Sequence, residues 1–135
     1  MATHVISEHT TVIVPHSSYK AYKLLQTAFV AAPLIAGVDK FFGFLVNWTL
    51  YLSPVISSRI SADVFMKVVG VAEIAAAMVV MANPRIGGRL VAFWLWAIIL
   101  NLLSIPGYYD IALRDFGLSL GALALSNLSE DKSDY

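Results

Sequence analysis

The chain of 135 residues contains no cysteine. Without thiols it cannot form a disulfide, a thiolate zinc site or a cysteine-held iron–sulfur cluster. Its three histidines, His4, His9 and His16, all precede the long apolar runs, so none lies where two helices could supply paired axial ligands to a haem. We therefore expect no metal site and no cofactor that is bound covalently or through Cys or His ligands.

Several catalytic sequence motifs are also missing. The chain has no Walker loop, no dinucleotide-binding glycine signature and no zinc metalloprotease motif. These absences argue against an enzyme that is complete by itself.

Charged residues are scarce, at 13% of the chain, whereas a soluble domain usually carries about 25%. Hydrophobic residues make up 59% and gather in long runs, which is typical of an integral membrane protein. Nine basic and nine acidic residues give a net charge of zero, so no basic patch suggests a nucleic-acid partner. Membrane lipid is the environment that this composition predicts.

Four apolar runs have the length of roughly 20 residues that a helix needs to cross a bilayer. They predict an all-α fold, an integral membrane four-helix bundle in one domain over residues 20–128. The expected spans are residues 22–40, 64–82, 90–105 and 108–128. A polar tail, residues 1–19, precedes this domain, and a short acidic tail, residues 129–135, follows it.

Residues 41–58 connect the first two spans and are apolar on one helical face. They predict an amphipathic helix that lies in the membrane interface, with Trp48 and Tyr51 as aromatic anchors. The alternative is a re-entrant segment. Pro54 ends the segment in either case.

Small residues and one proline mark the faces on which the spans are expected to pack. Pro33 has no backbone donor and should bend the first span. Gly117 and Gly121 form a GxxxG pattern, which favours close contact between helices. We expect helix interfaces at Pro33, Gly37, Gly70, Gly117 and Gly121.

Ionisable residues within or beside apolar spans are costly in lipid and mark a functional or structural site. Glu73 lies near the middle of the second span, and Arg114 lies about two turns into the fourth. We expect a buried network in which Glu73 pairs with Arg114 or Lys40. The predicted cluster comprises Asp39, Lys40, Glu73, Asn101, Asp110, Arg114 and Asp115.

Three roles are open for this cluster. It could lock the register of the helices, as buried polar groups do in other proteins. It could bind a polar group such as a quinone carbonyl or a lipid headgroup. It could also be a proton relay, although four short spans leave little room for a proton-coupled carrier.

The basic residues predict an orientation in the membrane. One end of the bundle should carry Lys20, Lys23, Arg85, Arg89 and Lys132, and the other Lys40, Arg59, Lys67 and Arg114. Three of the latter four lie within or at the ends of spans, where pairing masks them. The positive-inside rule then places both termini in the cytoplasm.

Three pieces of the chain resemble the DoxX-like family of small four-helix membrane proteins. They are residues 36–41 (AGVDKF), residues 69–73 (VGVAE) and residues 110–117 (DIALRDFG). The resemblance extends over roughly residues 24–128. The sequence departs from the family in its long N-terminal tail and in Gln26, which stands near the place of an arginine that members often carry.

The resemblance implies a bundle with a polar cluster on one side of the membrane, carried here by Lys40, Glu73, Arg114 and Asp115. Some members resemble the small subunit of thiosulfate:quinone oxidoreductase, and others belong to oxidative-stress complexes. The expected function is a membrane subunit or anchor of a quinone-linked redox complex in a bacterial inner membrane. The alternative is a non-catalytic assembly or interaction protein, as some distant relatives are, whose partners are other membrane subunits or a second copy.

Overall fold

A computed structural model describes residues 16–130 of the chain. The helices are, in chain order, α1 (His16–Phe42), the 3-10 turn η2 (Trp48–Tyr51), α2 (Pro54–Ser57), α3 (Ala62–Ala82), α4 (Pro84–Leu103) and α5 (Tyr109–Glu130). No strand occurs within residues 16–130. The predicted all-α fold is confirmed for this part of the chain.

Four of these helices, α1, α3, α4 and α5, are long and apolar enough to cross a membrane. They contain 27, 21, 20 and 22 residues and follow the order of the four predicted spans. Residues 16–19, predicted as part of the polar tail, belong to α1, and α5 continues through Glu130. The remainder of both predicted tails, residues 1–15 and 131–135, lies outside the described residues.

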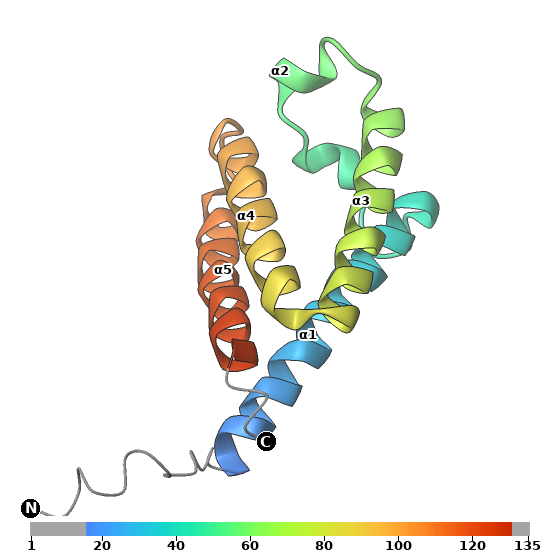
Figure 1. Cartoon of the computed structure of the whole chain (residues 1–135). Helices are drawn as coiled ribbons and strands as arrows, with labels where there is room; N and C mark the ends of the chain where they lie inside the picture. The colour runs from blue at the N-terminus through green and yellow to red at the C-terminus, as the bar shows by residue number, and fades with distance from the viewer. Residues whose placement is uncertain (1–15, 131–135) are drawn as a thin grey trace, which may run out of the picture.

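The long helices form two antiparallel pairs, α1 with α3 and α4 with α5 (Figure 1). The pairs meet where α1 begins, α3 turns into α4 and α5 ends, and we call this the turn end. They diverge towards the opposite end, which carries residues 43–61 and the α4–α5 turn and which we call the loop end (Figure 1). A hydrophobic core joins the two pairs through Tyr22, Phe29, Ala76, Val80, Val91, Ala92, Ala122 and Leu125.

The turn between α3 and α4 brings these helices together over very few residues. Asn83 caps α4 by accepting a hydrogen bond from the amide of Ile86 at 3.3 Å, and Pro84 occupies the first helical turn. A Cβ atom at Gly87 would lie 2.5 Å from the Cα atom of Val80. Only glycine therefore allows the two helices to approach this closely.

Residues 41–58 do not form the single amphipathic helix that the sequence predicts. Instead, α1 ends at Phe42, and Gly43 adopts a positive φ of 73°, which favours glycine over any other residue. The segment then follows an irregular path through η2 and α2. Pro54 begins α2, with Ser53 as the N-cap, rather than ending a helix. The apolar periodicity of this segment did not reveal where α1 stops.

Two of the predicted packing glycines lie at the crossing of α1 and α3. A Cβ atom at Gly37 would lie 2.7 Å from the backbone oxygen of Gly70, and the converse distance is also 2.7 Å. The two backbones therefore touch at this point. Pro33 lies one turn earlier in α1, which continues as one helix to Phe42.

The GxxxG pattern on α5 packs through only one of its two glycines. A Cβ atom at Gly117 would meet nothing within 4 Å, whereas one at Gly121 would lie 3.3 Å from the ring of Phe29 on α1. The close contact between α4 and α5 forms at Gly88, which packs against the backbone of Ala122 and Ser126. The predicted helix contact is therefore found at Gly121 but not at Gly117.

Candidate functional site

A buried ion pair joins α1 to α3 across the glycine crossing, with Lys40 on the loop-end side of Gly37 and Glu73 on the turn-end side of Gly70. Lys40 Nζ lies 2.8 Å from Glu73 Oε2, and the two side chains are only 4% and 9% exposed. The crossing sets this geometry, because Gly70 lies against the Cβ atom of Lys40 and Gly37 against that of Glu73. Of the two partners predicted for Glu73, the structure places Lys40 against it.

Trp48 lies in the segment between α1 and α3, residues 43–61, which we call the loop, and it covers the ion pair on that side. Its ring lies over the Lys40 ammonium, with 3.7 Å between Nζ and the ring centroid. A cation–π contact of this kind is strongest where water is excluded. Lys40 therefore has a carboxylate on one side and an aromatic face on another, which together compensate for its burial.

Asp39, next in sequence to Lys40, organises the loop instead of balancing the ion pair. Its carboxylate accepts hydrogen bonds from the amides of Phe44 at 2.8 Å and Leu45 at 3.0 Å. It also accepts one from the indole Nε1 of Trp48 at 2.8 Å. Asp39 is thus the group that positions the Trp48 ring over Lys40. The sequence showed a charged pair at residues 39 and 40 but not this division of roles.

Trp94 of α4 approaches the ion pair from the second pair of helices. Its indole N–H group is buried beside the Glu73 carboxyl, although the two do not meet in the geometry of a regular hydrogen bond. Trp94 therefore brings α4, and a polar N–H group, next to the Glu73 side of the ion pair.

Asn101 fastens the loop to α4. Its side chain donates to the carbonyl of Tyr51 at 2.5 Å and accepts from the amide of Ser53 at 2.8 Å. The Tyr51 ring also meets the ring of Tyr108, with 5.1 Å between centroids. Because the loop is held at its start by Asp39 of α1 and further along by Asn101 of α4, it bridges the two helix pairs at the end where they diverge.

Arg114, Asp115 and Asp110 do not join the Lys40–Glu73 pair. Arg114 is 65% exposed on its side chain and contacts the buried carboxylate of its neighbour Asp115, with 3.1 Å between Nη2 and Oδ1. Asp110 is exposed. The prediction of one network over α1, α3 and α5 is therefore wrong, because the helix pairs diverge and α5 presents Arg114 outwards.

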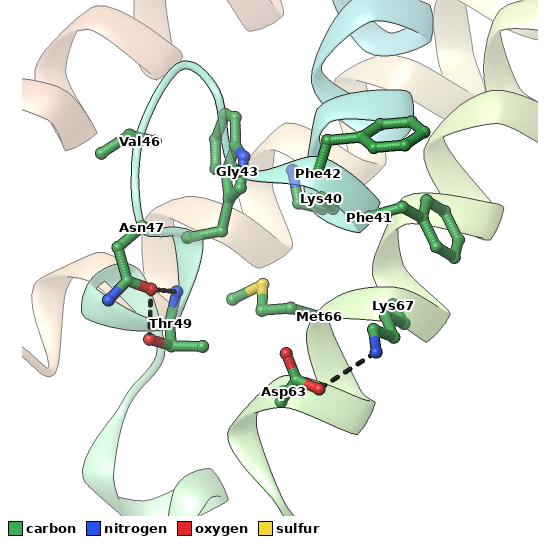
Figure 2. A pocket seen from close by; sticks show the side chains of 11 residues that line it. Lys40, Phe41, Phe42, Gly43, Val46, Asn47, Thr49, Asp63, Met66 and Lys67 are labelled. Atoms are coloured by element: carbon green, nitrogen blue, oxygen red, sulfur yellow. Dashed lines mark hydrogen bonds and ion pairs between the residues drawn. The ribbon is translucent and has the colours of Figure 1, made fainter.

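A partly open hollow of about 190 Å³ lies between the end of α1, the loop and the start of α3. Figure 2 shows its lining, with the Asn47–Thr49 turn on one side of Met66 and Lys67 on the other. The ammonium of Lys67 lies 3.2 Å from the carboxylate of Asp63, one helical turn earlier. Lys40 of the buried ion pair forms part of the wall of this hollow.

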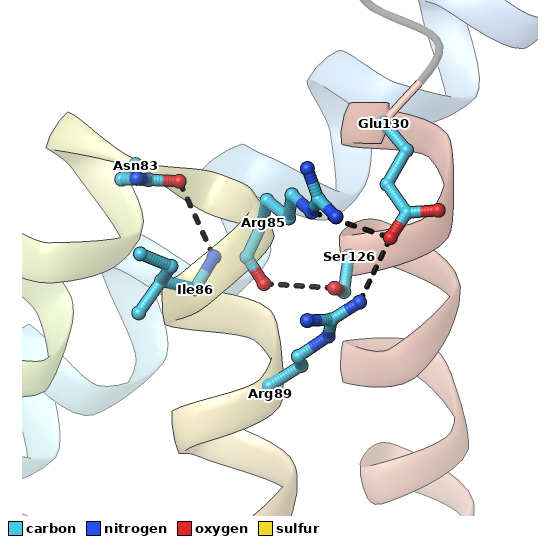
Figure 3. A network of polar contacts seen from close by, with 6 residues as sticks. All are labelled: Asn83, Arg85, Ile86, Arg89, Ser126 and Glu130. Carbon is cyan, nitrogen blue, oxygen red and sulfur yellow. Dashed lines mark hydrogen bonds and ion pairs between the residues drawn. The ribbon is translucent and has the colours of Figure 1, made fainter.

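A second polar cluster lies at the turn end (Figure 3). Arg85 and Arg89 of α4 contact the Glu130 carboxylate of α5 at 3.2 and 2.8 Å, and the Ser126 hydroxyl donates to the carbonyl of Arg85 at 2.7 Å. These contacts fasten the two ends of the α4–α5 pair. The ion pairs are half exposed, so they belong to the helix ends and form no enclosed site.

Residues 117–121 read GLSLG, which has the spacing of the nucleophile elbow found in α/β hydrolases. Here the segment lies inside α5, and the Ser119 hydroxyl is buried and donates to the carbonyl of Phe116 at 2.6 Å. A nucleophile elbow needs a strand-to-helix turn that exposes the serine, so Ser119 is a packing residue. No group of three or more His, Cys, Asp or Glu side chains in the described range could hold a metal ion.

No family model matches the chain, and no curated protein or solved structure matches it either.

Proposed function

We propose that the chain is an integral membrane protein of the DoxX-like type, which serves as a membrane subunit or anchor of a quinone-linked redox complex. In this proposal it resides in a bacterial inner membrane and contacts quinone or lipid at the loop end. The catalytic chemistry belongs to a partner subunit, since this chain has no set of residues that suffices for catalysis.

The apolar exterior of the helices supports the membrane placement. Each long helix carries a large apolar side chain that is 62–75% exposed, namely Leu24, Val68, Phe93 and Leu113. Large apolar side chains exposed on all four long helices are expected for contact with lipid or other subunits.

The observation that carries the proposal is the Lys40–Glu73 ion pair at the Gly37–Gly70 crossing. It lies where residues 36–41 and 69–73 meet, which are two of the three pieces that resemble the DoxX-like family. The two charges neutralise each other within the chain. In this proposal the pair stabilises the α1–α3 contact, and the redox chemistry takes place in a partner subunit.

Purification in a gentle detergent, followed by mass spectrometry of all bound proteins and extracted lipids, tests this proposal. We expect a redox enzyme or a quinone in stoichiometric amount with the full chain. Preparations that contain neither, even under the mildest extraction, would contradict the proposal.

A non-catalytic assembly or interaction protein is the second candidate. It is favoured because four of the predicted site residues have structural partners within the chain: Asp39 and Asn101 hold the loop, and Lys40 and Glu73 pair with each other. The same purification separates the candidates, because a clean homo-oligomer or a complex with a protein that has no redox activity supports this second role.

We also propose that both termini face the cytoplasm. Lys20, Lys23, Arg85 and Arg89 gather at the turn end, where only Glu130 opposes them among the described residues. At the loop end the Lys40 ammonium is neutralised by Glu73, which leaves fewer free cations there. The positive-inside rule then favours a cytoplasmic turn end.

A further inference from the structure

We propose that the hollow at the loop end binds the headgroup of a zwitterionic phospholipid, namely a phosphate joined to a protonated primary amine. This inference rests on the membrane placement proposed above, and it names a ligand class for the hollow.

The first argument is the charge pattern of the hollow. Lys67 and Asp63 lie one turn apart on α3, and their side chains are 50% and 71% exposed. An exposed pair at this spacing contributes little to stability, so a ligand can replace each partner at little cost. The Lys67 ammonium would then bind the phosphate, and the Asp63 carboxylate would bind the amine.

The charge balance distinguishes this headgroup from others. Glu73 neutralises Lys40, so the other charges that line the hollow are the exposed Lys67 ammonium and Asp63 carboxylate, which pair with each other. A zwitterion can replace both partners of this pair. A headgroup with only a negative charge would leave Asp63 facing a like charge, and a quinone carries no charge that could replace either partner.

The loop lines the far side of the hollow with a polar side chain, that of Asn47. The Asn47 side-chain oxygen accepts hydrogen bonds from the amide and the hydroxyl of Thr49, at 3.2 and 2.6 Å. These bonds fix the orientation of the side-chain amide. Figure 2 shows Asn47 across Met66 from Lys67, so Asn47 and Thr49 form a fixed polar wall opposite the Lys67–Asp63 pair.

The surroundings of the hollow favour a lipid over a soluble molecule of the same headgroup chemistry. Phe42 and Phe44 are exposed beside the hollow, as are Val64 and Val68 on the face of α3 next to Lys67. Such apolar side chains at the end of membrane-crossing helices lie at the level where headgroups give way to acyl chains.

Lipid retention by the purified full-length chain tests the inference. The protein is exchanged into detergent that contains equal amounts of phosphatidylethanolamine, phosphatidylcholine and phosphatidylglycerol, and native mass spectrometry then counts each lipid that stays bound. We expect phosphatidylethanolamine to be retained at least about tenfold better than the other two, because choline cannot donate a hydrogen bond to Asp63.

Substitutions assign that retention to the hollow. Lys67→Met and Asp63→Asn should each abolish the preference, and both positions are exposed, so the fold should persist. Lys20→Met and Asp110→Asn are matched controls. They remove one charge of each sign outside the hollow and should leave the lipid preference unchanged. Each variant is checked for an unchanged thermal transition.

Equal retention of the three lipids, a preference for phosphatidylglycerol, or a preference that survives both substitutions would overturn the inference. Displacement of the lipid by soluble phosphoethanolamine at equal concentration would also overturn it, since the headgroup alone would then suffice. A redox partner that co-purifies while the lipid preference is absent would leave the proposed function intact and remove only this inference.

Discussion

At the scale of single residues, adjacent charges have separate tasks. Lys40 is buried and needs Glu73 as its counter-ion, whereas Asp39 beside it accepts hydrogen bonds from the loop. An isolated charge among apolar helices is unfavourable by several kcal/mol, so the two members of the buried pair depend on each other.

Removal of one member of the pair should therefore be more harmful than removal of both. We expect Glu73→Gln to lower the free energy of unfolding by about 3 kcal/mol, because the Lys40 charge is left buried without a partner. The double variant Lys40→Met/Glu73→Gln should recover a large part of this loss. Unfolding in mixed detergent micelles measures all variants, and additive losses in the double variant would show that the two charges are not coupled.

Asp39→Asn should loosen the loop without dissolving the bundle. The amide keeps one acceptor oxygen, so it cannot receive all three hydrogen bonds that come from Phe44, Leu45 and Trp48. We expect a loss of about 1–3 kcal/mol in local stability. Hydrogen exchange of the amides of residues 44 and 45 should become faster, whereas exchange within α4 should not change. Protection equal to that of the unmodified chain would contradict the role assigned to Asp39.

At the scale of elements, long apolar runs were enough to predict four helices and their order. The apolar runs do not indicate which face of each helix packs against its neighbour. For that reason the GxxxG pattern included Gly117, although α5 packs through Gly121, Ala122 and Ser126. The path of the chain beyond α1 could not be predicted either, because it depends on the positive φ of Gly43 and on hydrogen bonds to the side chain of Asp39.

The same limits explain the outcome for the candidate site. Lys40, Glu73 and Asn101 were recognisable because polar groups stand out in apolar helices. The contact of Trp48 with Lys40 could not be recognised in the sequence, because it depends on the irregular path of the loop. Arg114 was assigned to the wrong network because the sequence does not show that the two helix pairs diverge.

Glycine substitutions should separate the real crossing from the apparent one. Gly70→Ala places a Cβ atom 2.7 Å from the backbone oxygen of Gly37, and a backbone contact cannot yield easily. We expect it to lower the free energy of unfolding by about 1–3 kcal/mol. Gly117→Ala is the matched control. Its Cβ atom meets nothing within 4 Å, so it should be neutral or stabilise the chain by up to about 1 kcal/mol through helix propensity. The reverse ranking in thermal unfolding would refute the packing described for α1 and α3.

At the scale of the whole molecule, the hydrophobic core that the two helix pairs share within residues 16–130 lies towards the turn end. At the loop end the connection is made by the loop, which Asp39 holds on one side and Asn101 on the other. This asymmetry gives the protein one firmly packed end and one end whose shape depends on polar contacts. Under the proposed orientation, the loop end lies outside the cytoplasm.

The absence of cysteine allows a direct test of that orientation. A single cysteine is introduced at Ser58 in the loop or at Asn127 near the end of α5, both of which are exposed. In intact cells a membrane-impermeant maleimide should label the cysteine at residue 58 and reach the one at residue 127 only after lysis. The opposite pattern would invert the topology, and labelling of both in intact cells would argue against a membrane that separates the two ends.

The central claim is that the Lys40–Glu73 pair supports the structure of a redox subunit and does no chemistry. The most direct measurement is the yield of co-purified redox enzyme and quinone per folded molecule, for the unmodified chain, for Glu73→Gln and for Lys40→Met/Glu73→Gln. We predict that Glu73→Gln lowers the amount of folded protein, and that the double variant restores it with unchanged partner and quinone per molecule. A double variant that folds as well as the unmodified chain but no longer retains the enzyme or the quinone would contradict the claim.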